Sequence, residues 1–323
     1  MAGMHRVYKG NAGSPYMTCK NCKEKPVFVQ ISNVPLCRQH FIRYFEKKVL
    51  YTIKKFSIIN KNDKIVAALS GGKDSTTILY ILNELSKKTR HFTLSALLID
   101  EGIKNYRDKT KQDAIDFCKK NKISLEILSY KKDLGNTLDE MLKKVKQKPC
   151  SICGVFRRYL LNKGARNLHA TKLATGHNLD DEAQSILMNQ FRRNNETSAR
   201  LGPITGILKD KQFIPRIKPL YLLTEKEVAI YAFLKQFPVT FTECPNAPQG
   251  YRGDVRIMLN QLESKYPGTK HSIVNTFLEN LPYLKESCKT KSTLNYCKIC
   301  KEPTSKEICQ ACVLLNEIKK KNV

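Results

Sequence analysis

The sequence predicts an α/β protein built on a doubly wound parallel sheet, flanked by small cysteine-rich modules at the N-terminal and C-terminal ends. Three observations support this fold class. Short β-branched segments alternate with segments that carry apolar residues at helical spacing, a glycine-rich loop follows the first of these strands, and four-ligand cysteine sets stand near both ends. Strand and helix alternation is typical of parallel sheets, because each parallel connection needs a crossover helix.

The elements are expected in alternating order from residue 64 onward. The predicted strands are residues 64–69, 93–99, 124–129 and 172–175. The predicted helices between and after them are residues 76–87, 108–119 and 181–191. Beyond residue 240 the pattern is helical, over residues 251–266 and 270–281. We expect Pro267 and Pro282 to end these two helices, because proline does not continue a helix.

Composition excludes several classes of protein. The chain has 323 residues, 57 basic against 29 acidic side chains and a formal net charge of +28, which indicates a polyanionic partner such as nucleic acid. A hydrophobic content of 41% is enough to bury a core and excludes disorder throughout. No apolar run resembles a transmembrane helix or a signal peptide, so we expect a cytoplasmic protein with no membrane association.

A phosphate-binding loop is predicted directly after the first strand, before a helix begins. Its residues are Ser70, Gly71, Gly72, Lys73, Asp74 and Ser75. Glycines let backbone amides turn toward an anion, and the helix N-terminus adds partial positive charge. The spacing is not that of a Walker A loop, because the two glycines are adjacent and an aspartate follows the lysine. The alternative is an incidental Gly/Ser turn.

Acidic residues follow two other strands. Asp100 follows the second strand, and Gly176, His177, Asp180 and Asp181 follow the fourth. The carboxyl ends of parallel strands meet at one edge of a sheet, so these residues are expected beside the loop. Neighbouring carboxylates there suit Mg²⁺, with Asp181 the stronger candidate. The alternative is helix capping, with Asp180 as the N-cap.

Seven of the twelve cysteines, together with one histidine, fall into two closed sets. The first set is Cys19, Cys22, Cys37 and His40, and the second is Cys297, Cys300, Cys309 and Cys312. Four ligands at such spacing are typical of structural zinc. Each set lies in a segment too short to fold unaided, so we expect two zinc ions to stabilise these segments.

Three other cysteines are candidates for chemistry. Cys150 and Cys153 follow Pro149 at a predicted helix start beside Arg157, and Cys244 lies in a loop. Three thiolates without a fourth suit an iron–sulfur cluster with one iron left open, whereas a catalytic disulfide needs only two. The spacing leaves open whether Cys244 meets the pair.

Together these motifs resemble the PP-loop ATP pyrophosphatases, which have a HUP-like Rossmann fold. Within that superfamily the chain resembles the tRNA 2-thiouridine synthetases of the TtuA and cytosolic thiouridylase type. The resemblance rests on residues 70–75, Cys150 and Cys153 with Gly154, Arg157 and Arg158, residues 176–181, Cys244, both zinc sets, and residues 253–263 and 267–270.

The resemblance implies that ATP activates the C2 oxygen of a tRNA uridine as an adenylate, and that sulfur then displaces AMP. The implied cofactors are ATP, Mg²⁺, two Zn²⁺ and a 4Fe-4S cluster on Cys150, Cys153 and Cys244; persulfide chemistry on the same residues stays an alternative. Lys73, Asp181 and Arg157 complete the implied catalytic set. Family members often have lysine at the position of Arg157, and arginine stabilises anions without transferring protons.

The resemblance also divides the chain into five parts. These are a leader or disordered arm (1–16), a Cys₃His zinc finger (17–53), a PP-loop domain (54–240), a helical tRNA-binding extension (241–287) and a Cys₄ zinc ribbon with a basic tail (288–323). Candidates for tRNA contact are residues 143–148, Arg192, Arg193, Arg252 and Arg256. Relatives are often homodimers, and the sulfur donor is either sulfide or a thiocarboxylated ubiquitin-like protein.

Family members act at wobble uridine 34 or at uridine 54 of the T-loop. A composition rich in Asn, Lys and Cys favours a mesophilic origin and therefore uridine 34. Two other function classes compete. A PP-loop enzyme with another acceptor is disfavoured by the three cysteines outside the zinc sets, and a non-catalytic nucleic-acid-binding zinc protein would release no pyrophosphate from ATP.

Overall fold

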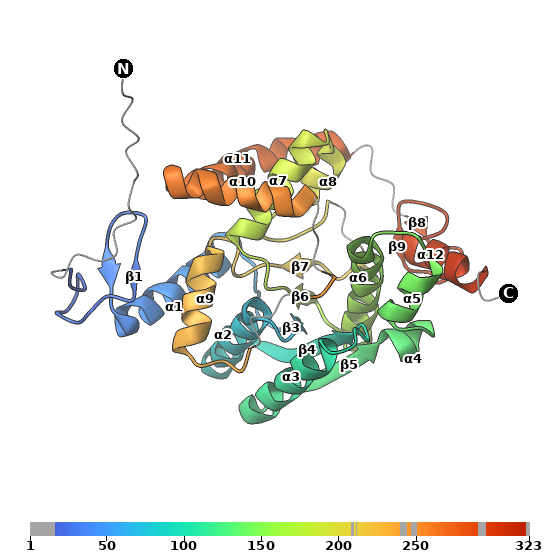
Figure 1. The fold of residues 1–323 in the computed structure, drawn as a ribbon, viewed down its shortest axis with the longest axis horizontal. Coiled ribbons are helices and arrows are strands. Elements are labelled where there is room, and N and C mark those ends of the chain that lie inside the picture. The colour runs from blue at the N-terminus through green and yellow to red at the C-terminus, as the bar shows by residue number, and fades with distance from the viewer. Residues whose placement is uncertain are drawn as a thin grey trace, which may run out of the picture. The chain divides into compact units, whose positions relative to one another are not determined.

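The computed structural model describes residues 17–207, 210, 212–239, 244–246, 251–289 and 295–320. The chain forms two compact units, Met1–Lys47 and Lys48–Val323, and each is described by itself (Figure 1). The predicted arm over residues 1–16 and the predicted boundary at residues 240 and 241 lie outside the described residues.

The strands and helices follow one another along the chain in a mostly alternating order. The strands are β1 (Phe28–Val29), β2 (Pro35–Leu36), β3 (Asp63–Leu69), β4 (Phe92–Asp100), β5 (Leu125–Ser129), β6 (Lys172–Ala174), β7 (Arg216–Ile217), β8 (Asn295–Tyr296) and β9 (Pro303–Thr304). The helices are α1 (Arg38–Lys55), α2 (Lys73–Thr89), α3 (Arg107–Asn121), α4 (Tyr130–Leu134), α5 (Leu138–Lys144), α6 (Pro149–Asn167), α7 (Leu179–Phe191), α8 (Asn195–Ala199), α9 (Glu225–Leu234), α10 (Tyr251–Lys265), α11 (Thr269–Lys289) and α12 (Gln310–Lys320).

The first unit has a small aromatic core. β1 pairs antiparallel with β2, and α1 begins two residues later. The ring of Phe41 lies 5.0 Å from that of Phe28 and 6.1 Å from that of Phe45, and both Phe41 and Phe45 are fully buried. This core holds the start of α1 against the hairpin that precedes it, although a unit of this size buries little apolar surface.

The second unit contains a five-stranded sheet in the order β5-β4-β3-β6-β7, and all its pairings are parallel. β3 pairs with β4 from Asp63 opposite Phe92 to Leu69 opposite Leu98. The chain builds outward from β3 to β5 and then returns to place β6 on the other side of β3. The doubly wound parallel sheet predicted from the sequence is therefore confirmed, with its switch point between β3 and β6.

Helices cover both faces of this sheet. A Cβ added to Gly164 of α6 would lie 2.7 Å from a Leu97 methyl and 2.8 Å from a Leu128 methyl, so the glycine lets α6 approach one face closely. Ala96 and Leu98 point to the opposite face and are also fully buried, where α2 and α3 contact β4. Coverage of both faces explains why β4 is apolar along most of its length.

A second helical layer is formed by α7, α8, α10 and α11, shown at the top of Figure 1. Its buried core joins Leu179 and Ala183 of α7 to Leu259 of α10 and Val274 of α11. α7 begins at the switch point, so this layer stands next to the carboxyl ends of β3 and β6. No helix in the described part of the chain is long and apolar enough to cross a membrane.

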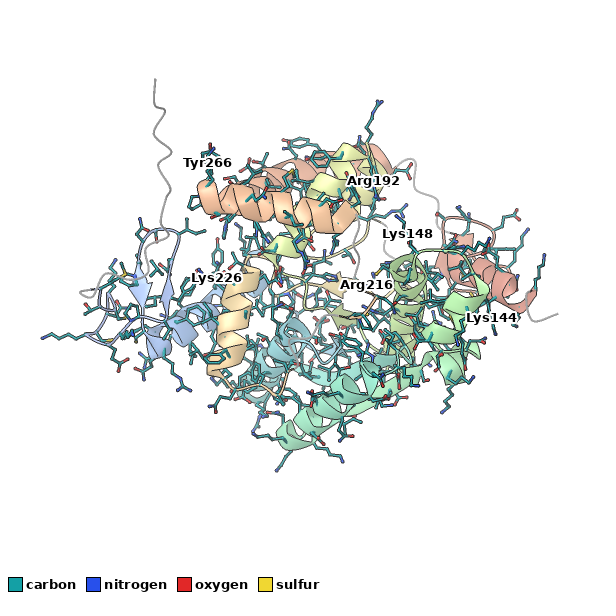
Figure 2. The ribbon with its side chains drawn as sticks, viewed as in Figure 1. Lys144, Lys148, Arg192, Arg216, Lys226 and Tyr266 are labelled. Atoms are coloured by element: carbon teal, nitrogen blue, oxygen red, sulfur yellow. The ribbon has the colours of Figure 1, made fainter. Side chains whose placement is uncertain are left out.

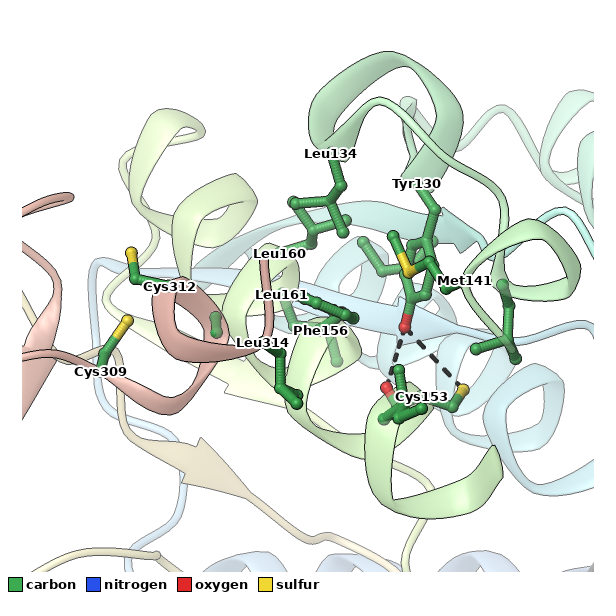
Figure 3. Packing of buried hydrophobic residues seen from close by; sticks show 14 of the residues in the cluster. Tyr130, Leu134, Met141, Cys153, Phe156, Leu160, Leu161, Cys309, Cys312 and Leu314 are labelled. Atoms are coloured by element: carbon green, nitrogen blue, oxygen red, sulfur yellow. Dashed lines mark hydrogen bonds between the residues drawn. The ribbon is translucent and has the colours of Figure 1, made fainter. Parts of the chain in front are cut away.

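The C-terminal module, residues 295–320, packs against α6. β8 and β9 form an antiparallel pair, and Cys309, Cys312 and Leu314 belong to the same buried cluster as Cys153 and Phe156 (Figure 3). Buried polar contacts add to this packing. Glu302, only 5% exposed, accepts a hydrogen bond of 2.8 Å from Nδ2 of Asn162 and forms an ion pair with Arg166, both on α6.

One local expectation is wrong, one edge strand was not predicted, and the capping alternative names the wrong residue. α11 does not end before Pro282 but continues to Lys289, and Leu281 and Cys288 are buried on either side. Tertiary packing of this helix outweighs the one backbone hydrogen bond that proline removes. The two-residue edge strand β7 was not predicted, because it is too short to show a period. The N-cap of α7 is Asn178 and not Asp180.

Candidate active site

The phosphate loop connects β3 to α2 in a tight turn. Gly71 has a φ of +80°, which favours glycine, and its missing Cβ would lie 2.5 Å from the carbonyl oxygen of Thr110. Inside the turn the backbone N–H of Ser70 donates to Oγ of Ser75 at 3.1 Å, and the two hydroxyls lie 3.0 Å apart. These contacts hold the loop around the N-terminus of α2, where an anion is stabilised by free amides and the helix dipole.

The segment after β6 crosses this loop closely. A Cβ at Gly176 would lie 2.8 Å from the backbone nitrogen of Ser75, and Nδ2 of Asn178 donates to Asp74 at 3.0 Å. The segments after β3 and β6 thus meet at the switch point. The structure brings together the two motifs that the sequence analysis placed at one nucleotide site.

Lys73 extends from the first turn of α2 between two carboxylates. Its Nζ lies 3.0 Å from Asp74 and 2.9 Å from Glu225 of α9. Burial alone would lower the pKa of Lys73, but the charges of Asp74 and Glu225 hold it above the usual value. The ammonium stays charged at neutral pH and is held by partners that phosphate oxygens can replace. Glu225 was not expected at the site from the sequence.

The acidic candidates differ in how far they are already engaged. Asp100 accepts from the backbone N–H of Gly102 at 3.0 Å and pairs with Lys111 at 2.8 Å. Asp180 is buried, forms an ion pair with Lys270, and accepts from the backbone N–H of Glu225 at 2.7 Å. Both carboxylates therefore have close cationic partners that neutralise them, which leaves them less ready to take a metal ion.

Asp181 is the less engaged carboxylate. Its cationic neighbour Arg252 is 3.6 Å away, and its side chain accepts the backbone N–H of Asn178 in a capping box. Burial raises the pKa of Asp181 to about 6, against the opposing charge of Arg252. A carboxylate whose pKa is raised in this way gains most from a bound cation, so the residues present fit Mg²⁺ at Asp181.

His177 is neutral in this environment. The protein atoms and the charges of Lys218 and Arg216 around it lower its pKa below the usual value, although the residue itself is exposed to solvent. Its Nδ1 lies 2.9 Å from the Thr175 hydroxyl, which fixes the ring. His177 therefore serves as an uncharged hydrogen-bonding group between the loop and the basic side chains around it.

The structure brings Cys150, Cys153 and Cys244, the cysteine trio, into one neighbourhood. Cys150 Sγ donates to the carbonyl oxygen of Asn246 at 3.1 Å, which holds the Cys244 loop beside the start of α6. Burial raises the pKa of both Cys150 and Cys244, and the charge of Cys153 raises both further. Cys150 and Cys244, whose ionisation is disfavoured in this way, fit a positively charged metal group, because its charge stabilises thiolates.

The trio differs from a closed zinc set. Among the described residues, the groups whose candidate ligand atoms all lie within 4.8 Å of one another are the two predicted zinc sets, and the trio is not one of them. The sulfur ligands of a cubane cluster sit on separate irons, so they stand farther apart than ligands of one ion. An all-cysteine trio with wider spacing fits an iron–sulfur cluster that has an open iron.

Both zinc sets have the spacing of a tetrahedral site. Cys37 Sγ lies 3.2 Å from His40 Nδ1 and 3.5 Å from Cys22 Sγ, and Cys300 Sγ lies 3.6 Å from Cys309 Sγ. Zinc–sulfur bonds of about 2.3 Å in a tetrahedron place ligand atoms roughly 3.3–3.8 Å apart. The residues present fit one zinc ion in each set.

Arg157 links the trio to the sheet. Its Nη2 donates to Cys153 Sγ at 3.1 Å, while its Nε lies 3.0 Å from Oε1 of Glu101. The hydroxyl of Tyr130 donates to the Cys153 carbonyl oxygen at 2.8 Å (Figure 3). Burial would lower the pKa of Arg157, but Glu101 and Cys153 hold it above the usual value, so the guanidinium stays charged.

Of the basic residues predicted to contact tRNA, several lie on elements that border this site. Figure 2 shows Arg192 after α7, Lys148 at the start of α6 and Arg216 on β7. The guanidinium of Arg192 lies 4.3 Å from the centre of the Tyr251 ring, a cation–π contact. Arg252 donates to the Ser185 hydroxyl at 2.8 Å, beside Asp181. Arg216 was missed by the sequence analysis, because nothing in its local sequence marks it.

Comparison with known proteins identifies this arrangement. Residues 43–260 match the family model described as the PP-loop domain. The chain is 37% identical over 297 residues to a tRNA-5-methyluridine(54) 2-sulfurtransferase of Pyrococcus horikoshii, covering 92% of this chain and 93% of the relative. It is 34% identical to cytoplasmic tRNA 2-thiolation protein 1 of Laccaria bicolor, covering 94% of this chain and 86% of that protein.

A solved structure agrees with these relatives. The U34-tRNA thiolase NcsA from Methanococcus maripaludis, determined with its [4Fe-4S] cluster, superposes with a TM-score of 0.79 at 33% identity and covers 92% of this chain and 95% of that one. The chain belongs to the PP-loop tRNA 2-thiolation proteins. The resemblance inferred from the motifs is confirmed.

Proposed function

We propose that this tRNA 2-thiolation protein uses ATP to convert wobble uridine 34 of tRNA to 2-thiouridine. The main support for the proposal is that the phosphate loop and the cysteine trio lie within the same sheet domain. The similarity to a U34 thiolase supports the position, as does the composition of the chain, whereas one of the relatives named above acts at position 54.

The chemistry requires activation before sulfur transfer. The C2 oxygen of a uridine is a poor leaving group, and adenylation turns it into AMP, which leaves readily. At the N-terminus of α2, the phosphates of ATP can be stabilised by the amides of Gly71 and Gly72 and by the ammonium of Lys73. Asp181 is the side chain we assign to Mg²⁺, because it has the weakest cationic partner among the three aspartates.

Sulfur transfer takes place at the cysteine trio. Cys150, Cys153 and Cys244 would hold a 4Fe-4S cluster, which would supply a binding site for inorganic sulfide. Arg157 donates to Cys153 and carries a permanent charge, so it stabilises negative sulfur there and does not move a proton. The persulfide route on the same cysteines is the alternative, and iron content distinguishes it.

The remaining assignments are part of the same proposal. The two closed sets hold structural zinc, and basic residues at the ends of α6 and α7 contact the tRNA backbone. The names of the eukaryotic relatives support a cytoplasmic location. A homodimer and a sulfur donor, either sulfide or a thiocarboxylated ubiquitin-like protein, complete the expected partners.

The test is an anaerobic reaction of the full chain with ATP, Mg²⁺, sulfide and unmodified tRNA, followed by nuclease digestion and mass spectrometry. We expect 2-thiouridine at position 34, no thiolation by Lys73→Met, and unchanged zinc in that variant. Thiolation at position 54 would reassign the target. Absence of both AMP and 2-thiouridine would contradict the proposed activity, whereas AMP without thiolation would indicate that a sulfur carrier is required.

A further inference from the structure

A buried carboxylate stands between the two halves of the active site. Glu101 directly follows β4, and its side chain is 1% exposed. It forms an ion pair with Arg107, the first residue of α3, through Oε2, and lies 3.0 Å from Nε of Arg157 through Oε1. A carboxylate buried this deeply is costly unless both oxygens are compensated, and here two arginines from different helices compensate it.

The two arginines make their second contacts on opposite sides of Glu101. Nη1 of Arg107 donates to the carbonyl oxygen of Ser70 at 2.8 Å, at the start of the phosphate loop. Nη2 of Arg157 donates to Sγ of Cys153 at 3.1 Å. An unbroken series of polar contacts therefore runs from the phosphate loop through Arg107, Glu101 and Arg157 to the cysteine trio.

The two ends of this series differ in rigidity. The side chain of Arg107 is 5% exposed and also donates to the Thr110 hydroxyl at 3.4 Å. The carbonyl oxygen of Thr110 in turn packs closely against Gly71 of the phosphate loop. Arg157 is 46% exposed, and its contact with Oε1 of Glu101 lacks a hydrogen-bonding angle. A shift of the phosphate loop is transmitted directly to Arg107, whereas Arg157 has room to realign against Glu101.

We propose that Glu101 is a positioning residue that couples occupancy of the phosphate loop to the placement of Arg157 at Cys153. This inference rests on the proposed function, because it requires nucleotide at the loop and a metal group at the trio. With nucleotide bound, the loop fixes Arg107, Arg107 fixes Glu101, and Glu101 holds Arg157 against the Cys153 sulfur. The cysteines are then protected when ATP is in place.

The experiment measures coupling between the two sites without turnover. Anaerobically reconstituted protein is mixed with a ferrous chelator, and the rate of iron loss is followed with and without Mg²⁺ and the α,β-methylene analogue of ATP. Nucleotide affinity is measured in parallel for the iron-free and iron-loaded protein. We expect the analogue to slow iron loss by at least about fivefold in the unaltered chain, and nucleotide to bind more tightly to the iron-loaded protein than to the iron-free protein, although the rate and the affinity need not change by the same factor.

Glu101→Gln keeps the size of the side chain and removes its charge. We expect this variant to bind nucleotide and iron but to lose the coupling, so that the analogue changes iron loss less than about twofold. Arg157→Met tests the same link at a half-exposed position that folding tolerates, and the same loss is expected. Asp63→Asn is the matched control, because Asp63 is also buried, pairs with Lys172 at 2.8 Å and lies at the end of β3 opposite to the phosphate loop.

The outcomes are distinct. Coupling that persists in both Glu101→Gln and Arg157→Met, or that is lost equally in Asp63→Asn, overturns the assignment of Glu101. Independent binding of nucleotide and iron in the unaltered chain overturns the inference and leaves the proposed function standing. Failure of the unaltered chain to bind either one counts against the proposed function itself.

Discussion

The two cysteine-rich modules each carry a four-ligand set, Cys₃His in the first and Cys₄ in the second, but they depend on the rest of the chain in different ways. The N-terminal set belongs to a unit of its own, whose core is made by Phe28, Phe41 and Phe45. The cysteines of the C-terminal module are buried in the same cluster as Cys153 of the trio. We therefore expect metal at the first set to stabilise a local unit, and metal at the second set to support α6, the helix that carries Cys150 and Cys153.

The largest expected effect is the loss of iron when the C-terminal zinc set is broken. In Cys300→Ser the module loses a ligand and its stability, since structural zinc contributes about 10–16 kcal/mol to the folding of isolated modules. The packing of α12 on α6 is then lost, and Cys153 loses its support. We expect zinc to fall by one equivalent and iron to fall severalfold, as measured by elemental analysis of anaerobically purified protein.

Cys22→Ser is the matched change in the N-terminal set. It replaces a half-buried cysteine in the same kind of four-ligand group, and we expect it to lose one zinc while iron and nucleotide binding stay unchanged. Equal loss of iron in the two variants would show that both modules support the trio. The proposed difference between the modules would then be wrong.

A smaller effect is expected when the polar contacts between the C-terminal module and α6 are weakened without changing the metal ligands. Glu302→Gln breaks the buried pair with Arg166 and weakens the contact with Asn162. Breaking a buried ion pair costs about 3–5 kcal/mol, and the partial exposure of Arg166 reduces the expected loss to roughly 2 kcal/mol. Urea unfolding measures this loss, which we expect with both zinc ions retained.

Glu307→Gln is the control within the same module. Glu307 pairs with Lys298 at 3.0 Å, but both side chains are mostly exposed, and solvent screens such pairs. We expect no resolvable change in the free energy of unfolding. A loss as large as that of Glu302→Gln would mean that charge balance, and not the buried attachment to α6, holds the module in place.

Sequence and structure agree best where spacing alone defines a site. The two four-ligand sets and the phosphate loop are recognisable because each is local in the chain, and the parallel sheet follows from strand and helix alternation. Arg107 and Glu101 could not be assigned, because their roles depend on contacts with residues 37 and 56 positions away, at Ser70 and Arg157. Glu225 became part of the site only when α9 was placed beside α2.

Two local errors have the same origin. Pro282 was expected to end α11, since propensity disfavours proline inside a helix, but the contacts of α11 with α7 and α8 decide the outcome. The alternative for the acidic run, helix capping with Asp180 as the N-cap, names the wrong residue, because Asn178 two residues earlier makes the capping box with Asp181. Local sequence preference identifies candidate residues for helix ends, and tertiary contacts determine where the helix actually begins and ends.

The smallest expected effect is at Asp181, beside the switch point between β3 and β6, and we expect it to be independent of the N-terminal module. Burial raises the pKa of Asp181 to about 6, above its unfolded value, so the native state holds the proton more tightly and stability falls as pH rises from about 4 to 6. Asp181→Asn removes the titrating carboxyl group, and with it this fall in stability at higher pH. We expect metal-free Asp181→Asn to be more stable than the unaltered chain by about 1 kcal/mol at pH near 7, after allowing for solvent screening, with no difference near pH 4. Urea unfolding in the presence of a chelator at both pH values measures this gain in stability, and the same gain should appear in the Cys22→Ser background.

Two outcomes would contradict this prediction. A gain that vanishes in the Cys22→Ser background would show that the N-terminal module influences the carboxyl edge of the sheet. A gain that persists near pH 4 would assign the effect to capping of α7 and not to charge.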